Sequence, residues 1–178
     1  MEYYVMRHGL TDWNLEKKIQ GLTDIPLNET GIKQAQQAYQ RLKDIHFDLV
    51  YCSPLTRTRQ TAALATDNKY PIIADDLLIE RDFGQMEGND IVVSEVEKIW
   101  HEPIDQQYKN EETVAHMIWR AKTFINKIPK VDKVLIVTHG AFYRALRVVL
   151  ENIDPTTVDL FSYKLDNCGI YKISKGSN

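Results

Sequence analysis

Four side chains that could bind an anion or act as a nucleophile lie at the ends of short apolar runs or at the start of an expected helix. Arg7 and His8 follow one such run near the N-terminus, and His139 follows another far along the chain. Arg57 lies about one turn into a helix, so its side chain can point back over the start of that helix. Two permanent cations, two imidazoles and nearby helix N-termini would form an anion site, most naturally for phosphate.

The two apolar runs, Tyr3–Met6 and Val134–Thr138, are long enough for buried strands and too short for helices. Gly9, which follows His8, permits a sharp turn and a close approach of the backbone to a ligand. Ligands of open α/β sheets bind at the carboxyl ends of the strands. The sequence therefore predicts that the two imidazoles meet at one edge of a sheet.

Short strands alternate with helices along the chain. Strands are expected at residues 3–6, 47–52, 71–74, 134–138, 161–165 and 169–173, and helices at 28–45, 53–66, 93–100, 111–127 and 141–151. This alternation predicts an α/β fold, a three-layer sandwich with a mainly parallel central sheet flanked by helices. The length of 178 residues favours a single domain, 1–178.

Local signals set the expected boundaries of these elements. Asn28 is expected to cap the first long helix, and Ser53 followed by Pro54 is typical of the start of the second. Residues 166–169, with the sequence Asp-Asn-Cys-Gly, resemble a hairpin turn and are expected to join the last two strands. Residues 75–88 are punctuated by glycines and are expected to form a loop.

Composition excludes several classes of partner. The formal net charge is −3 and no long block of Lys or Arg occurs, which argues against nucleic acid or an anionic membrane. No apolar run approaches the ~20 residues of a membrane span, and the start lacks a signal-peptide pattern. Two cysteines, Cys52 and Cys168, do not make a disulfide scaffold. A cytoplasmic protein is therefore expected.

A metal site is the first alternative, because two histidines and a carboxylate such as Glu80 could bind a transition metal. Arg7 and Arg57 argue against it, since both would repel a divalent cation, and no acidic cluster balances their charge. We therefore expect neither a metal nor another cofactor.

A nucleophilic imidazole fits these residues better. The two arginines disfavour the imidazolium and keep the ring neutral below its ordinary pKa of ~6.5. A neutral imidazole beside an arginine-held phosphoryl group can attack phosphorus in line, with positioning and charge neutralisation supplying most of the catalysis. The leaving alcohol needs a proton, which Glu80 or its neighbour Asp82 could supply, and spacing alone does not separate the two.

Five blocks of the chain carry a family resemblance. They are Arg7-His8-Gly9 with Thr11 and Asn14, residues 21–31, residues 53–62, residues 78–88, and Thr138-His139-Gly140. In this order they resemble the signature of the histidine phosphatase superfamily, the phosphoglycerate-mutase-like proteins. Arg-His-Gly alone is a weak signal, whereas five ordered blocks from residue 3 to about 150 are a specific one. The resemblance implies a phosphoglycerate mutase-like version of the expected fold.

The resemblance also implies roles for the site residues. His8 would be the nucleophile that forms a phosphohistidine, and Arg7, Arg57 and His139 would bind and neutralise the phosphoryl group. Glu80 matches the general acid, which favours it over Asp82. Asn14 matches a position that contacts phosphate, and Thr11 and the backbone near Gly21 are weaker matches toward the substrate side. The family needs no metal for this chemistry.

Departures from the mutase pattern favour hydrolysis. Leu10, Phe83 and Ala141 stand where mutases of this family usually have Glu, Tyr and Asn, and the chain leaves little room for substrate-enclosing insertions. An open pocket would admit water to the phosphohistidine. The expected activity is therefore a metal-independent phosphomonoesterase acting on small-molecule phosphate esters. The alternatives are mutase-type phosphoryl transfer and a catalytically idle protein that only binds phosphorylated ligands.

The alkyl or aryl part of such an ester would need an apolar rim. Trp13, Ile19, Phe83, Met86 and the segment 92–108 could line it. The alternative is that Trp13 and Phe83 pack the loops together. The sequence does not select the physiological substrate, and a monomer and a homodimer are both compatible with it.

Overall fold

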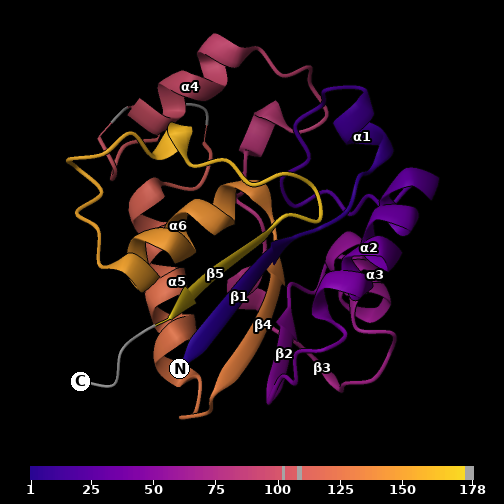
Figure 1. The fold of residues 1–178 in the computed structure, drawn as a ribbon. Coiled ribbons are helices and arrows are strands. Elements are labelled where there is room, and N and C mark those ends of the chain that lie inside the picture. Colours follow the sequence, from indigo (N-terminus) through magenta and orange to yellow (C-terminus); the bar gives the residue numbers. More distant parts are fainter. Residues whose placement is uncertain (102, 108–109, 175–178) are drawn as a thin grey trace.

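The computed structural model describes residues 1–101, 103–107 and 110–174. Its centre is a five-stranded sheet with the order β3-β2-β4-β1-β5 (Figure 1). The strands are β1 (Glu2–Arg7), β2 (Leu49–Cys52), β3 (Ile72–Ala74), β4 (Lys133–Thr138) and β5 (Ile170–Ser174). The first four are parallel to one another, and β5 runs antiparallel to β1 at one edge. The predicted α/β fold with a mainly parallel sheet is confirmed.

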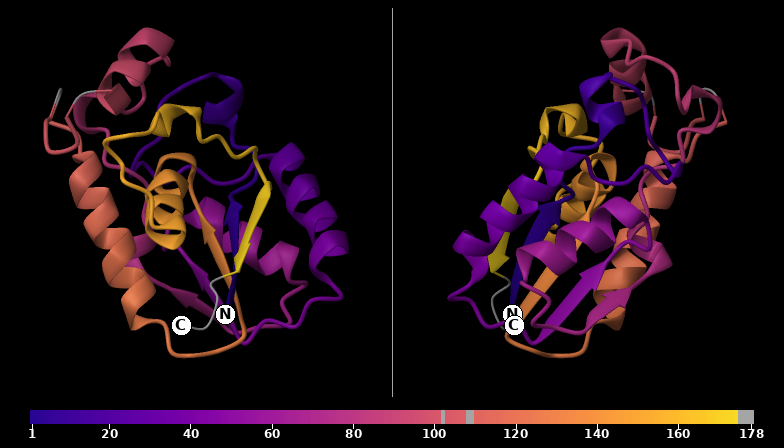
Figure 2. Two further views of the ribbon diagram at one scale, coloured as in Figure 1. Left: turned by 60° about the vertical axis from the view of Figure 1, so that its left-hand side comes forward. Right: turned by 90° about the vertical axis from the view of Figure 1, so that its right-hand side faces the viewer.

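Six α-helices surround this sheet in the described part of the chain. They are α1 (Asp12–Leu15), α2 (Glu29–Leu42), α3 (Thr56–Ala65), α4 (Val93–His101), α5 (Val114–Lys127) and α6 (Gly140–Glu151), with short 3-10 turns η1 (Asp76–Leu78), η2 (Gly84–Met86) and η3 (Leu160–Ser162). Helices α2 and α3 cover one face of the sheet, and α5 and α6 cover the other (Figure 2). This arrangement is the expected three-layer sandwich.

The alternation of side chains along β1 explains why both faces are covered. Successive residues of a strand point to opposite faces of its sheet. Tyr3 and Val5 pack with the apolar side chains of α5 and α6, whereas Tyr4 and Met6 pack with those of α2 and α3. A strand that is apolar on both faces gains the most when helices bury both of them.

The prediction of a strand at residues 161–165 is wrong. Residues 161–165 alternate in polarity like a strand, but Leu160–Ser162 forms η3 and the chain continues as a loop along the top of the sheet. The Asp159 side chain accepts a hydrogen bond from the Phe161 backbone N–H (2.9 Å), which closes this turn. The turn at Asp166–Gly169 is present, with the Gly169 N–H donating to the Asp166 carbonyl, but it leads from the loop into β5 alone.

Helix boundaries differ from expectation in three places. Helix α3 begins at Thr56 instead of Ser53, because the Thr56 N–H donates to Asp24 Oδ1 (2.7 Å) and Ser53 turns toward the site. Helix α5 begins at Val114 instead of 111, since its start is capped by the Thr113 side chain. Helix α2 ends at Leu42 instead of 45, while its predicted cap at Asn28 is confirmed. None of the described helices is both long and apolar enough to cross a membrane.

Candidate active site

The predicted site residues come together at the carboxyl ends of β1 and β4, as expected. A cavity of about 330 Å³ lies there, and among its walls are the following predicted residues: Arg7, His8, Asn14, Gly21, Arg57 and Glu80. Arg7 ends β1 and His8 follows it, while His139 follows β4 and precedes α6, which begins at Gly140. The parallel pairing of β1 with β4 therefore brings together residues that are far apart in the chain.

The His8 imidazole is oriented by its own loop. Its Nδ1 lies 2.7 Å from the Gly9 carbonyl oxygen, and only an N–H can donate to a carbonyl. The proton therefore sits on Nδ1, and Nε2 keeps a lone pair. Burial lowers the pKa of His8 well below its ordinary value, and the charges of Arg57 and Arg7 lower it further. The prediction of a neutral ring is supported, although burial is a larger cause than the arginines.

His139 does not line the cavity, although it was expected to bind the phosphoryl group. Its ring centroid is 5.3 Å from that of His8, and the residue is fully buried without lining the cavity. Its Nδ1 accepts from Arg57 Nε (3.2 Å), and its Nε2 therefore donates to Ser53 Oγ (2.8 Å). Burial, followed by the charge of Arg57, lowers the pKa of His139 well below its ordinary value. The neutral ring orients Arg57, a contact the sequence did not predict.

The two arginines keep donors free for an anion. The side chain of Arg57 is buried and donates through Nη1 to the Thr23 carbonyl (2.8 Å) and through Nη2 to the Gly21 carbonyl (2.7 Å). With its bond to His139, three of its five N–H groups are used within the described residues. Arg7 donates through Nη1 to the Leu165 carbonyl (2.9 Å), and its buried Nε has no described partner. Burial lowers the pKa of both, that of Arg57 to about 10, so both remain cations at neutral pH.

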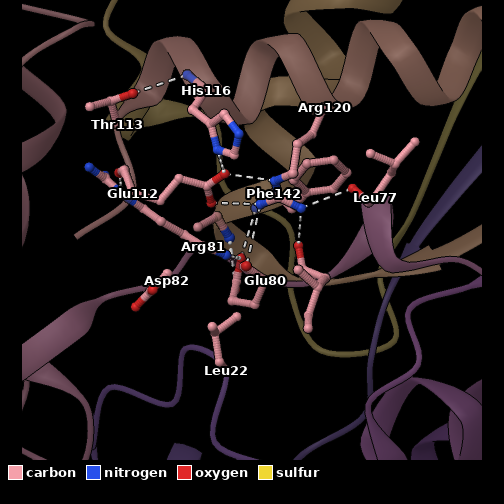
Figure 3. A network of polar contacts seen from close by, with 12 residues as sticks. Leu22, Leu77, Glu80, Arg81, Asp82, Glu112, Thr113, His116, Arg120 and Phe142 are labelled. Atoms are coloured by element: carbon pink, nitrogen blue, oxygen red, sulfur yellow. Dashed lines mark hydrogen bonds and ion pairs between the residues drawn. The ribbon is translucent and has the colours of Figure 1, made fainter. Parts of the chain in front are cut away.

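Glu80 lies at the N-terminus of α6. Its Oε1 accepts from the backbone N–H of Phe142 and of Arg81 (2.9 Å each), and its Oε2 accepts from Ala141 (3.1 Å) (Figure 3). The first N–H groups of a helix have no partner within the helix, so these bonds satisfy them and fix the position of the Glu80 carboxyl group. The competing Asp82 accepts from Gly84 and lines a neighbouring cavity instead of the His8 cavity. The geometry thus favours Glu80 over Asp82.

The loop that carries Glu80 is held by Arg120 of α5 (Figure 3). Arg120 Nη1 donates to the carbonyls of Leu77 and Ile79 (2.9 Å each). Its Nε and Nη2 form a bidentate pair with Glu112 (2.7 and 2.6 Å). Nη2 also lies 3.4 Å from the Glu80 carbonyl, so all five N–H groups have partners. This saturated arginine is a structural support, in contrast to Arg7 and Arg57.

The two weaker matches, Thr11 and Gly21, contact Asn14 and Arg57 respectively. Asn14 lines the cavity, and its Oδ1 accepts from the backbone N–H and the hydroxyl of Thr11 (3.1 Å each). Thr11 is fully buried, caps α1 and does not line the cavity, so it positions Asn14. Gly21 lines the cavity with a φ of +53°, and a Cβ there would lie 1.9 Å from Glu87 Oε1. Only glycine fits this turn, whose carbonyl holds Arg57.

The expected apolar rim is partly confirmed. Ile19 and Phe83 line the cavity, together with Val93, Val96 and Trp100 from the segment 92–108. The structure contradicts two members of the set: Met86 is buried in the core, and Trp13 packs near Gly88 without lining the cavity. Tyr108, at the end of that segment, lies outside the described residues.

Polar side chains that were not predicted from the sequence also line the cavity, chiefly Gln20, Arg144, Lys164 and Asp166. Arg144 lies four residues after Gly140 on α6, so helix periodicity was a signal that could have found it. Lys164 lies in the segment 161–165 that was expected to be a strand, and Asp166 begins the predicted turn at 166–169. Among the described residues, no cluster of three or more His, Cys, Asp or Glu side chains could hold a metal ion.

Comparison with known proteins identifies the family. The model of the histidine phosphatase superfamily (branch 1) matches residues 3–177. A protein of Bacillus subtilis named "Uncharacterized phosphatase PhoE" is 38% identical over 173 residues, which cover 95% of this chain and 86% of that protein. A 2,3-bisphosphoglycerate-dependent phosphoglycerate mutase of Methylobacterium sp. (strain 4-46) is 34% identical over 169 residues, covering 85% of this chain and 81% of the mutase.

A solved structure agrees with this result. Phosphoserine phosphatase of Entamoeba histolytica, in complex with 3-phosphoglyceric acid, matches with a TM-score of 0.82 at 28% identity, covering 96% of this chain and 89% of that chain. The resemblance drawn from the five sequence blocks is confirmed, and so is the enzyme class, a phosphatase of this superfamily. The chain belongs to branch 1 of the histidine phosphatase superfamily.

Proposed function

We propose that the chain, acting as one catalytic domain, hydrolyses small-molecule phosphate monoesters without a metal, through a phosphohistidine on His8. The observation that carries this proposal is the orientation of His8: Nδ1 donates to the Gly9 carbonyl, which leaves the lone pair of Nε2 beside two arginines. An imidazole attacks through an unprotonated nitrogen that is held in position, and the hydrogen bond to Gly9 and the lowered pKa of His8 support both requirements.

In the first step, His8 Nε2 forms a bond to phosphorus as the ester P–O bond breaks. The spare N–H groups of Arg7 and Arg57 hold the phosphoryl oxygens and neutralise the charge that they carry. Glu80 transfers a proton, taken up from solvent, to the departing alkoxide, so that a neutral alcohol leaves.

In the second step, water attacks the phosphohistidine and Glu80 accepts one of its protons. The new P–O bond forms as the N–P bond breaks, which releases inorganic phosphate and restores neutral His8. Glu80 serves both steps because its backbone hydrogen bonds to α6 keep its position constant.

The rim of the cavity supports a substrate with a small, partly apolar alcohol group. Ile19, Phe83, Val93, Val96 and Trp100 provide apolar walls beyond the phosphate end. The predictions of a cytoplasmic location and of a monomer or homodimer belong to this proposal. Mutase-type transfer is the second candidate, because a relative 34% identical is named a phosphoglycerate mutase.

The test is hydrolysis of p-nitrophenyl phosphate between pH 4 and 8 with EDTA present, comparing the wild type with His8→Ala. We expect EDTA-resistant activity in the wild type and a loss of at least about a thousandfold in the variant, since no other group replaces the nucleophile. Brief incubation with ³²P-labelled substrate should label the wild type with an acid-labile, alkali-stable phosphoryl group.

Two results would contradict the proposal. Substantial activity in His8→Ala would exclude the phosphohistidine, and loss of wild-type activity in EDTA would exclude the metal-independent route. Interconversion of phosphoglycerates, stimulated by a bisphosphorylated activator and faster than hydrolysis, would favour the mutase instead.

A further inference from the structure

A second polar group in the catalytic cavity has no part in the proposed phosphoryl transfer. Arg144 of α6 and Trp100 of α4 line the same cavity as His8. The guanidinium carbon of Arg144 lies 4.5 Å from the centroid of the Trp100 ring and 5.6 Å from that of Phe161. Stacking on aromatic faces holds a guanidinium in place and leaves its in-plane N–H groups for hydrogen bonding.

Those N–H groups are poorly satisfied by the protein. Arg144 Nη1 and Nη2 each lie 3.4 Å from a carbonyl oxygen, of Gly140 and Phe161 respectively, which is long for an N–H···O bond. Arg144 Nε and Trp100 Nε1 are buried with no partner among the described residues. Buried donors are normally paired, because an unpaired one loses the free energy of its bond to water. Two adjacent unpaired donors in one cavity indicate that a ligand supplies the acceptor.

The charge of Arg144 indicates the kind of acceptor. No described carboxylate lies within ion-pair distance of it, whereas Arg120 forms a bidentate ion pair with Glu112. Burial lowers the pKa of Arg144 to about 10, so the group is still a cation at neutral pH. The more distant charges are mixed: Glu80 and Asp159 favour the cation, while Arg7 and Arg81 disfavour it.

A carboxylate matches this arrangement. Its two oxygens accept side by side from a guanidinium fork, and the anion would compensate the buried cation. Lys164, which also lines the cavity, adds a second positive charge at the rim, and Asp166 opposes it from the same loop.

We propose that Arg144, held by Trp100, binds a carboxylate on the part of the substrate beyond the phosphate ester. The physiological substrate is then a phosphate monoester of a small carboxylic acid. This inference rests on the proposed phosphatase function and adds a specificity-determining residue to it.

The test compares esters that differ by one carboxylate: phenyl phosphate, 3-carboxyphenyl phosphate and 4-carboxyphenyl phosphate. We measure kcat and KM for the wild type, Arg144→Met and Arg144→Lys. Arg144→Met is expected to lower kcat/KM for at least one carboxylated ester about tenfold or more relative to phenyl phosphate, mainly through KM. Arg144→Lys should recover part of the loss, because it keeps the charge but not the fork.

Arg147→Met is the matched control. Arg147 lies one turn further along α6, pairs with Glu151 and stacks on Tyr163 without lining the cavity. Arg147→Met should change kcat/KM for all three esters by the same factor. If Arg144→Met instead lowered kcat/KM by the same factor for all three esters, Arg144 would act through the stability of the fold or through the electrostatic environment of Glu80. No loss on either carboxylated ester would also overturn the inference.

Binding measurements separate this inference from the proposed function. Calorimetric titration of His8→Ala and of His8→Ala/Arg144→Met with the same three esters needs no turnover. A preference for a carboxylated ester that disappears with Arg144 supports the subsite even if the wild type hydrolyses nothing. Equal affinity for all three esters overturns the subsite even if hydrolysis is fast.

Discussion

At the scale of single residues, the cavity depends on ionisable groups that have been taken out of water. His8 is 3% exposed and His139 is fully buried, and burial is the largest cause of the lowered pKa of each. A buried imidazole beside two guanidinium groups is held in the form that carries a lone pair. The same burial that keeps the proposed nucleophile His8 unprotonated makes protonation of both rings costly to the fold.

The stability of the protein should therefore fall as the pH is lowered. In the unfolded chain a histidine has a pKa of ~6.5, and in the folded chain His8 and His139 titrate well below it, so the unfolded state binds more protons in acid. Their contribution is fully present above about pH 6.5 and is lost as the pH falls toward the folded pKa. Each ring adds a slope of up to about 1.4 kcal/mol per pH unit to the free energy of unfolding.

Denaturant unfolding between pH 8 and 5.5, in phosphate-free buffer, measures this slope. His139→Gln should remove about half of the slope that arises from the two rings, because one titrating group is lost. The control is His46→Gln, at a histidine that does not line the cavity and contacts Tyr70. An unchanged slope in His139→Gln would contradict our account of the buried imidazole.

At the scale of the elements, two helices share the task of placing Glu80. The N-terminus of α6 supplies backbone N–H groups to its carboxylate, and α5 supplies Arg120 to the loop behind it. Arg120 also lies 4.4 Å from the ring centroid of Phe142, whose N–H donates to Glu80. Glu80, the proposed general acid, is thus held from both sides by elements that pack on the same face of the sheet.

Arg120→Met should destabilise the fold and impair catalysis together. It leaves Glu112, which is 9% exposed, as a buried charge without its bidentate partner, at a cost of about 3–5 kcal/mol in unfolding free energy. We expect kcat to fall more than KM rises, because the loop that carries Glu80 loses its support while the arginines of the phosphate site remain. Urea unfolding and steady-state kinetics check the two parts.

A double variant controls for this effect. Arg120→Met/Glu112→Gln also removes the carboxylate that lost its partner, so it should recover part of the unfolding free energy. It should not recover kcat, because the loop that carries Glu80 is still unsupported. Full recovery of kcat in the double variant would show that Arg120 only neutralises Glu112.

At the scale of the whole molecule, the sheet separates two hydrophobic cores, and the cavity lies at the carboxyl ends of its strands. The loops that close the cavity come from three parts of the chain: residues 18–21, the segment from Glu80 to Trp100, and residues 161–166. Substrate that bridges these loops binds only the folded state, so it should stabilise the whole fold.

Inorganic phosphate should raise the melting temperature of the protein. At a hundred times its dissociation constant, a ligand adds about 2.7 kcal/mol to the free energy of unfolding. For a chain of this size that corresponds to a shift of roughly 5–10 °C. Scanning calorimetry with phosphate, against chloride at equal ionic strength, measures the shift.

Arg57→Gln should lose this shift, because the buried guanidinium that faces the anion is gone. The control is Arg59→Gln on the same helix, where the side chain is exposed and does not line the cavity. An equal shift in Arg57→Gln and in the wild type would contradict the placement of the phosphate beside Arg57.

Much of this molecule could be predicted from the sequence because the signals are local. Apolar runs followed by histidines predicted β1 and β4, and the parallel pairing of such strands predicted that His8 and His139 would meet. The ordered blocks predicted the family and named Arg7, Arg57 and Glu80. Periodicity and capping located helices α2 to α6 to within a few residues, since both act over single turns.

Other features arise only from contacts between distant segments. Residues 161–165 have the polarity pattern of a strand, but Asp159 closes the turn η3 at its start and the Leu165 carbonyl accepts from Arg7 of β1. The saturation of Arg120, the inward position of His139 and the unsatisfied donors of Arg144 depend on which groups the fold brings within hydrogen-bond distance. The sequence by itself determined which residues could do the chemistry. Tertiary structure decided their roles, because a side chain's free donors, burial and charge depend on neighbours from other parts of the chain.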